Sequence, residues 1–441
     1  MKVILLTSFS DLQKAYSLNI VVQSQIKMLL LNGYEPTVIV HESFTPEGIY
    51  ADPRVTIEKI PNVPCHNEVR KDETFDQDVE SIAIRLREIL KDRDVVLTHD
   101  IIYQNACLKH NFAARKVAKE LPGVKWLHWI HSATSPSLLN MLRPIFSDEY
   151  LNLVKTPFPN SKYVYPNSYA VPSVARNFGV SEEDICVVNH PTDICGYLGI
   201  DPLVEEFIYR KKILESDVIC TYPIRLDRGK QVEYVIKTIS MLKEFGLTVR
   251  LIVIDFHSTG GDKITYREEL KQLGIDWGLN GQEMTFLSEE NEEWRHEVDQ
   301  RIVAGFMTLS NVFIMPSVSE TYSLIAQEAA ITKQVVVLNG DFPPFRSIYG
   351  ENAIYRKYSS RFDILADLPE AISETSETNT QYGSANLPQD ARKSAERAYH
   401  YATAGMIVAR LKHQEMALSI KHRKNNNLIT IFKKQLEPLF F

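Results

Sequence analysis

Cysteine is scarce in this chain of 441 residues, and long apolar runs are missing. The five cysteines are scattered and form no Cys-x-x-Cys pair, which argues against a disulfide framework and against a zinc site built on paired cysteines. No apolar stretch approaches the ~20 residues that a membrane-spanning helix needs. The first residues turn polar too soon for a secretory signal peptide and are predicted to form a strand. We therefore expect a cytoplasmic protein, at most peripheral on a membrane.

Positive charge is also in deficit. The chain carries 49 Lys and Arg against 56 Asp and Glu, a formal net charge of -7. This balance excludes a protein whose whole surface serves nucleic acid, although it leaves room for a local basic groove. A signature of nucleophilic catalysis by Ser/His or Cys/His is missing too. The hydrophobic content of 44% is that of an ordinary soluble enzyme, and the length suffices for two domains that each bury a core.

What the sequence does contain is an alternation of short apolar runs and helical patterns from end to end, which predicts α/β domains with parallel sheets. We expect a first domain over 1–200, a second over 210–390 and a helical segment over 390–441 that crosses back toward the first. The polar stretch 373–388 is expected to be a surface loop. Strands are predicted at 3–7, 37–40, 95–98, 126–130, 163–168, 218–222, 249–254, 284–287, 312–315 and 335–338.

The most informative segment is 316–330, which reads PSVSETYSLIAQEAA. It follows an apolar strand pattern and runs into an Ala-rich helical pattern, so a strand, a Pro-Ser loop and a helix start are predicted in turn. Free amide groups at a helix start favour an anion. Glu320 in the loop and Glu328 on the second helical turn are placed to bind a polyhydroxylated ligand. The alternative is a capped surface helix with two solvated glutamates.

A second strand, loop and helix pattern lies about ninety residues upstream, at 217–239. Its loop carries Arg225 and Lys230, and Gly229 lets backbone approach a ligand closely. The planar fork of an arginine and the compact charge of a lysine together suit a diphosphate. The alternative is a pair of solvated loop cations.

Together these two segments resemble the C-terminal half of glycosyltransferase family 4, which consists of retaining nucleotide-sugar glycosyltransferases with the GT-B fold. The matching positions are Arg225, Lys230, Pro316, Ser317, Glu320 and Glu328. Two positions depart from the family pattern. Gly229 precedes Lys230 where the family has a glycine after the lysine, and Ser323 stands where the family usually has glycine.

The resemblance implies two Rossmann-like doubly wound domains and the transfer of a hexose-type sugar, with retention, from a UDP- or GDP-linked donor. Arg225 and Lys230 would stabilise the leaving diphosphate, so neither a metal nor another cofactor is expected. Glu320 would hold sugar hydroxyls and Glu328 the ribose. The remaining donor-binding candidates are Ser317, Thr321, Tyr322, Ser323 and Leu324.

In the N-terminal half the best candidate is His131, which follows the strand predicted at 126–130 and stands where α/β folds bind ligands. It matches the family's strand-end histidine near the donor sugar and completes the catalytic set with Arg225, Lys230 and Glu320. His99-Asp100 and Asn189-His190 are further candidates at strand or hinge ends, whereas His128 is expected in the core. The loop at 8–17 lacks the glycines usual in the family, and Lys14 or Ser17 would have to substitute for them.

The acceptor stays open between a glycan, a lipid-linked sugar, a small molecule and modified DNA. A DNA-modifying, phage-type transferase, a nucleotide-sugar epimerase and a non-catalytic sugar-nucleotide-binding protein are alternative functions on the same fold. Residues 410–434 carry seven Lys or Arg against one acidic residue. This segment is either the solvated face of a helix or a peripheral contact for a polyanion, namely a membrane surface or DNA.

Overall fold

The computed structural model describes residues 1–13, 16–63, 71–131, 148–255, 262–317, 323–357 and 389–441. The chain divides into two compact units. The first comprises Met1–Asp193 together with Asn426–Phe441, and the second comprises Ile194–Asn425. The C-terminal segment therefore belongs partly to the second unit and partly to the first.

The first unit is built on a parallel sheet with the strand order β3-β2-β1-β4-β5-β6-β7 in its described part. Its central strands are short apolar runs that are buried along their whole length, as strands covered on both faces must be. The strands are β1 (Val3–Leu6), β2 (Thr37–His41), β3 (Thr56–Ile60), β4 (Val95–His99), β5 (Lys125–Trp129), β6 (Ser161–Tyr165) and β7 (Ile185–Val187).

Helices connect these strands. The first of them ends where Gly33 takes a φ of +79°, a conformation that glycine adopts freely. The C-terminal helix α16 contacts α1, and Phe432 just beyond α16 packs edge-on against Tyr34, so the end of the chain covers the first helix. The helices of this unit are α1 (Ser17–Leu31), α2 (Phe75–Leu90), α3 (Leu108–Glu120), α5 (Asp148–Lys155), α6 (Val171–Phe178) and α16 (Leu428–Ile431).

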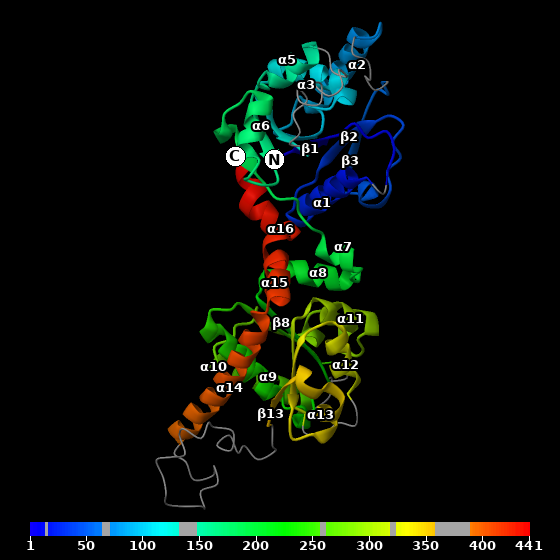
Figure 1. Cartoon of the computed structure of the whole chain (residues 1–441). Coiled ribbons are helices and arrows are strands. Elements are labelled where there is room, and N and C mark those ends of the chain that lie inside the picture. Colours follow the sequence, from blue (N-terminus) through cyan, green and yellow to red (C-terminus); the bar gives the residue numbers. More distant parts are fainter. Residues whose placement is uncertain (14–15, 64–70, 132–147, 256–261, 318–322, 358–388) are drawn as a thin grey trace, which may run out of the picture. The chain divides into compact units, whose positions relative to one another are not determined.

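The second unit (Figure 1) has its own parallel sheet, whose strand order in its described part is β10-β9-β8-β11-β12-β13. The chain moves outward from β8 to β10 and then returns to the other side of β8. Because parallel crossovers are right-handed, this reversal puts helices on both faces of the sheet. The strands are β8 (Val218–Pro223), β9 (Val249–Ile254), β10 (Met284–Phe286), β11 (Val312–Met315), β12 (Val335–Asn339) and β13 (Ile354–Arg356).

Side chains fix several helix starts in the second unit. Asp201 and Asp299 accept hydrogen bonds from the backbone amides two residues on, at 3.0 and 2.8 Å, and thereby cap α8 and α11. The helices are α7 (Ile194–Leu198), α8 (Pro202–Arg210), α9 (Val232–Leu242), α10 (Asp262–Asp276), α11 (Gln300–Leu309), α12 (Leu324–Ile331), α13 (Pro343–Tyr349), α14 (Gln389–Leu411) and α15 (Gln414–Asn426).

The predicted architecture of two α/β domains with parallel, Rossmann-like sheets is confirmed, and every apolar run expected as a strand forms one. Three strands were not predicted, namely β3, β7 and β13, and all three lie at the edges of their sheets. The helical pattern at 390–424 is two helices rather than one, since α14 ends at Leu411 and α15 begins at Gln414. The loop expected at 373–388 lies outside the described residues. None of the helices in the described ranges has the length and apolar character to cross a membrane.

Candidate functional site

The second unit brings the two predicted segments to one edge of its sheet. Strands β8 and β11 are neighbours, but the connections that follow them leave in opposite directions along the sheet. Ligands of open α/β sheets bind at such a switch point, beyond the carboxyl ends of the strands. The loop after β8 carries Arg225 and Lys230, and the loop after β11 carries Ser317 and leads into α12. The topology thus places both loops at the point where a ligand is expected.

The loop after β8 is held by its own backbone. The amide of Lys230 donates to the carbonyl of Asp227 at 2.8 Å, and the Tyr222 hydroxyl donates to the carbonyl of Lys230 at 3.0 Å. The Arg225 side chain is 63% exposed, and its Nε lies 3.9 Å from a carboxylate oxygen of Asp227. Arg228 is engaged elsewhere, since it donates to Glu269 at 2.8 Å. Arg225 is therefore the arginine of this loop that is open to an incoming anion.

The loop after β11 is anchored on both sides. Ser317 is buried, and its carbonyl accepts a hydrogen bond of 3.0 Å from Asn339 at the end of β12. Ser323 takes a φ of +61°, and its hydroxyl accepts from the amide of Ala326 at 3.3 Å, which caps α12. The candidates Glu320, Thr321 and Tyr322 lie outside the described residues. The sequence did not point to Asn339, although a polar residue at a strand end was the available signal.

A hollow of about 320 Å³ lies where α12 faces the end of β8. Two predicted donor-binding residues, Leu324 and Glu328, line it together with Pro223 from the last turn of the strand. Within the described part of the chain the Glu328 carboxylate has no ion pair, and Leu324 is 73% exposed. The structure therefore brings Leu324 and Glu328 together around one cavity, while Arg225 and Lys230 do not line it. The other lining residues are Glu297, Val298, Gln300, Val303 and Ile325.

In the first unit the equivalent edge is occupied by histidines. His99 ends β4, His131 follows β5, and His190 follows β7. The Nδ1 of His99 lies 3.1 Å from the Nε2 of His131, and the rings of His131 and His190 are stacked with centroids 5.3 Å apart. The structure thus joins the leading candidate and both alternatives of the N-terminal half in one cluster. We call these three residues the histidine stack.

Burial favours the neutral form of the imidazoles in the histidine stack. Desolvation, followed by the nearby charge of His190, lowers the pKa of His131 to about 3. Desolvation also lowers the pKa of His99 well below its ordinary value, and that of His190 to a smaller extent. A neutral imidazole pairs one donor nitrogen with one acceptor nitrogen, which suits recognition of hydroxyl groups. His128 is buried in the core as predicted, at 2.8 Å from the hydroxyl of Thr98.

A buried carboxyl group, that of Asp100, is linked to the histidine stack through the Tyr103 hydroxyl. Asp100 has a φ of +61° and accepts hydrogen bonds from Tyr103 and, at 2.6 Å, from Gln104. The Tyr103 hydroxyl in turn accepts from the amide of His131 at 3.1 Å. Desolvation raises the pKa of Asp100 to about 6, although the Tyr103 hydroxyl opposes this shift. The sequence did not point to Tyr103, because this residue belongs to no recognisable motif.

The glycine-free loop after β1 is only partly described. Ser17 is exposed and begins α1, whereas Lys14 lies outside the described residues. Thr7, at the start of the loop, is buried and its hydroxyl donates to the carbonyl of Ile39 at 2.9 Å. The contribution of Lys14 or Ser17 to a ligand stays a prediction.

The first unit contains two Asp-x-Asp triplets, a carboxylate pattern of the kind that can hold a divalent metal. Asp78, which closes the triplet in the first turn of α2, accepts a hydrogen bond of 2.7 Å from Lys109. Asp94, which closes the triplet before β4, accepts from the amide of Lys2 at 2.7 Å. Neither triplet follows the carboxyl end of a strand. The described ranges contain no cluster of three or more His, Cys, Asp or Glu suited to a metal ion.

Comparison with solved structures finds glycosyltransferases, at low similarity. A glycosyltransferase from Rickettsia africae is 13% identical over 99% of this chain and 97% of its own, with a TM-score of 0.34. Sucrose-phosphate synthase from Thermosynechococcus elongatus is 15% identical over 96% and 98%, with a TM-score of 0.32. HepE from Anabaena, solved in complex with UDP-glucose, is 14% identical over 96% and 99%, with a TM-score of 0.31. Values this low carry no argument about the present chain. The sequence matches no family model and no curated protein.

Proposed function

We propose that the protein is a glycosyltransferase that moves a hexose-type sugar from a nucleoside diphosphate to an acceptor hydroxyl with retention of configuration. The observation that carries the proposal is the switch point of the second sheet. Two loops that resemble the donor-binding loops of glycosyltransferase family 4 follow the adjacent strands β8 and β11 at this point. Topology and motif resemblance thus favour the same edge of the sheet.

In the proposed reaction the bond between the anomeric carbon and the diphosphate oxygen breaks, and a bond to the acceptor oxygen forms on the same face of the sugar. The departing phosphate oxygen accepts the proton of the acceptor hydroxyl, so no protein nucleophile is required. Negative charge grows on the diphosphate, and Arg225 and Lys230 stabilise it. The exposed guanidinium of Arg225 supports this assignment.

The carboxylates have a different role in the proposal. Glu328, which lines the hollow beside Pro223, accepts hydrogen bonds from the ribose, and Glu320 accepts them from the sugar. The neutral imidazole of His131 serves as a hydrogen-bond partner for a hydroxyl group. The low pKa of His131 supports this role, because the ring stays neutral and keeps one unprotonated nitrogen near neutral pH.

The test is nucleotide binding in matched variants of the loop after β8. A ligand that binds only the native state raises the apparent melting temperature, so a panel of UDP- and GDP-sugars identifies the donor. Lys230→Ala should weaken donor binding about tenfold or more, as expected for the loss of a charged hydrogen bond. Arg228→Ala is the matched control, because it removes the same charge from the same loop but its side chain is bound to Glu269.

Equal donor affinity in Lys230→Ala, Arg228→Ala and the native protein would refute the assignment of the phosphate site. Transfer is expected to persist in EDTA, and dependence on added magnesium or manganese would show that the cationic loop is not sufficient. Incubation with donor alone tests the epimerase alternative, since that enzyme converts the donor without an acceptor. Binding without any turnover of donor would favour a sugar-nucleotide-binding protein.

A further inference from the structure

The basic segment 410–434 is not the single charged face that its sequence suggested. Arg423 is buried and donates to the carbonyls of Leu309 and Ser216 at 3.1 and 2.8 Å. Lys424 pairs with Asp217 at 2.6 Å, and Lys433 pairs with Glu437 at 3.1 Å. The segment is moreover divided between the two units at Asn425. Arg423 and Lys424 are therefore engaged by neighbouring groups of the second unit, and Lys433 is paired within its own helical turn.

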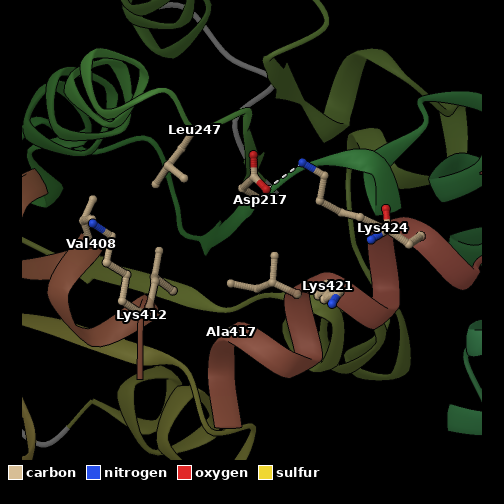
Figure 2. A pocket seen from close by; sticks show the side chains of 10 residues that line it. Asp217, Leu247, Val408, Lys412, Ala417, Lys421 and Lys424 are labelled. Carbon is tan, nitrogen blue, oxygen red and sulfur yellow. Dashed lines mark hydrogen bonds and ion pairs between the residues drawn. The ribbon is translucent and has the colours of Figure 1, made fainter. Parts of the chain in front are cut away.

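Two other lysines of this segment stand at the rim of a hollow in the second unit. The hollow has a volume of about 350 Å³ and lies where the turn between α14 and α15 meets the residues that precede β8 and β9 (Figure 2). Lys412 and Lys421 are exposed and have no ion pair within the part of the chain that the structure describes. The lining residues are Asp217, Leu247, Val408, Leu411, Lys412, Ala417, Ile420, Lys421, Lys424 and Asn425.

The lining of this hollow is mostly apolar, although three lysines stand around it. Leu247, Val408, Leu411 and Ile420 supply aliphatic side chains. The acidic group at the site, Asp217, is already satisfied, because it accepts from Lys424 at 2.6 Å and from the hydroxyl of Thr248 at 2.7 Å. The net charge that the hollow presents to a ligand is therefore positive. A cavity of this size with an apolar lining and a few polar groups is typical of small-molecule sites.

The hollow is separate from the proposed donor site. Asp217 and Leu247 precede β8 and β9, whereas Arg225 and Lys230 follow the carboxyl end of β8. Strand β8 has six residues, so the two ends of the strand are roughly 20 Å apart at the usual rise per residue. A ligand in the hollow does not occupy the position of a nucleotide at the switch point.

We propose that this hollow binds a lipid-like anion, with an alkyl chain against the aliphatic side chains and a phosphate at the rim, held by Lys412 or Lys421. Charge complementarity and the apolar lining together select this occupant. A nucleic acid offers phosphates but no aliphatic chain, so it would leave Leu247, Val408 and Ile420 without a partner. The same ligand chemistry has two sources, a single lipid in solution and the headgroup layer of an anionic membrane.

A chain-length series of alkyl phosphates, measured by isothermal titration calorimetry on the full chain, tests the soluble source. Affinity should rise about fourfold for each methylene until the hollow is full, because each buried methylene contributes a constant increment. Inorganic phosphate and a neutral alkyl maltoside should each bind much more weakly than the alkyl phosphate. Equal affinity for short and long chains, or for charged and neutral amphiphiles, would overturn the proposal.

Variants separate the two parts of the site. Lys412→Ala combined with Lys421→Ala should weaken binding of the alkyl phosphate about tenfold or more. Ala417→Phe keeps both lysines but fills the hollow, so it should abolish the dependence on chain length. Lys433→Ala combined with Lys434→Ala is the matched control, since it removes the same charge from the basic segment in the first unit. Equal losses in the control and the Lys412/Lys421 variant would overturn the proposal.

Vesicles of phosphatidylglycerol and phosphatidylcholine, against phosphatidylcholine alone, distinguish the membrane source. Co-sedimentation that is lost in Lys412→Ala with Lys421→Ala would assign the hollow to a membrane headgroup, whereas binding of the alkyl phosphate alone would assign it to a soluble lipid. Salt-dependent binding of duplex DNA with no response to any alkyl phosphate would overturn the proposal. Donor binding should be unchanged in the hollow variants, so the result is independent of the proposed transferase site.

Discussion

The two units of this protein have the same kind of sheet but present opposite chemistry at the carboxyl ends of their strands. In the first unit that edge carries the histidine stack and the buried Asp100, and burial favours the neutral form of the imidazoles. In the second unit it carries an exposed arginine and a glutamate without an ion pair in the described part of the chain. A shared architecture therefore fixes where a ligand site lies, and the residues at the strand ends decide what the site can bind.

The difference also predicts how each edge responds to its environment. A buried neutral network depends on desolvation and is sensitive to proton uptake, whereas exposed charges are screened by water and contribute little to folding. Protonation at the edge of the first sheet therefore changes the stability of its unit, whereas the charged side chains at the edge of the second sheet can bind a ligand with little effect on folding. Acid, substitution of Glu328 and substitution of Gln231 are expected to affect the two units differently.

The largest effect is expected from acid. The pKa values of the buried histidines are lowered in the folded state, so their contribution to stability is present above pH 6.5 and is lost as the pH falls toward their folded values. The raised pKa of Asp100 acts in the opposite direction, since this carboxyl favours the folded form at low pH. The histidines with lowered pKa are His41, His99, His110, His128, His131 and His190 in the first unit, and His400 in the second.

A buried histidine that stays neutral in the folded state lowers the stability by at most about 2 kcal/mol between pH 7 and pH 5. The first unit holds six of these seven histidines, so acid should destabilise it more than the second unit. Hydrogen-exchange mass spectrometry, corrected for the intrinsic rate at each pH, should show β4 and β5 opening before β8 and β11. His131→Asn should reduce the difference, whereas His296→Asn, at an exposed position, should leave it unchanged. Earlier opening of the second unit would contradict the comparison.

The second prediction is that a substitution at Glu328 lowers activity but leaves stability unchanged. Glu328→Gln keeps the shape of the side chain but removes the charge, and it should lower kcat/KM roughly tenfold to a hundredfold if a charged hydrogen bond to the donor is lost. The melting temperature should stay near normal, because the carboxylate forms no ion pair with the described residues. Glu297→Gln is the control, since Glu297 lines the same hollow but does not belong to α12.

A large drop in melting temperature with full activity in Glu328→Gln would mean that the residue is structural. An equal loss of activity in Glu297→Gln would mean that the charge of the hollow matters and not the position of Glu328. Glu320→Gln is expected to behave as Glu328→Gln does.

How much the sequence could predict depends on the kind of signal. The buried strands were predictable because continuous apolar runs are what parallel sheets require. The missed strands β3, β7 and β13 are short or half-exposed edge strands, as in the run Thr56–Ile60, where Glu58 and Lys59 interrupt the apolar pattern. The break between α14 and α15 was also missed, because the residues at the turn, Lys412 and His413, carry no breaker such as Gly or Pro.

The side-chain network of the candidate site was less accessible. Motif matching pointed to His131 and left His99 and His190 as alternatives, since residues of three separate loops meet only through the strand order. The seven cations at 410–434 looked alike in sequence. Their different roles depend on long-range contacts, such as the hydrogen bonds of Arg423 to carbonyls that are 114 and 207 residues away in the sequence. A local sequence pattern does not contain this information.

The two departures from the family pattern have a conformational explanation. Gln231 stands at the place of the family's glycine after the lysine and has a φ of +51°, and Ser323 stands at the other glycine position with a φ of +61°. Both are left-handed conformations that glycine adopts without strain. The backbone thus retains the shape for which glycine is suited, although the side chains differ. Ser323 offsets part of the strain by capping α12, whereas the Oε1 of Gln231 is buried and has no hydrogen-bond partner among the described residues.

The smallest predicted effect follows from Gln231. Gln231→Gly should stabilise the second unit by about 0.5 kcal/mol, because the left-handed conformation costs a side-chain-bearing residue roughly 1–2 kcal/mol and the added freedom of glycine in the unfolded chain costs about 0.5–1 kcal/mol. Gln272→Gly is the matched control, since Gln272 is an exposed residue of the helix α10 and its replacement should destabilise by about 1 kcal/mol. Urea unfolding followed by the exchange of α9 and α10 amides measures both. If the two variants lower stability equally, the positive φ at Gln231 carries no strain, and the glycine of the family pattern must then serve close approach to the ligand instead.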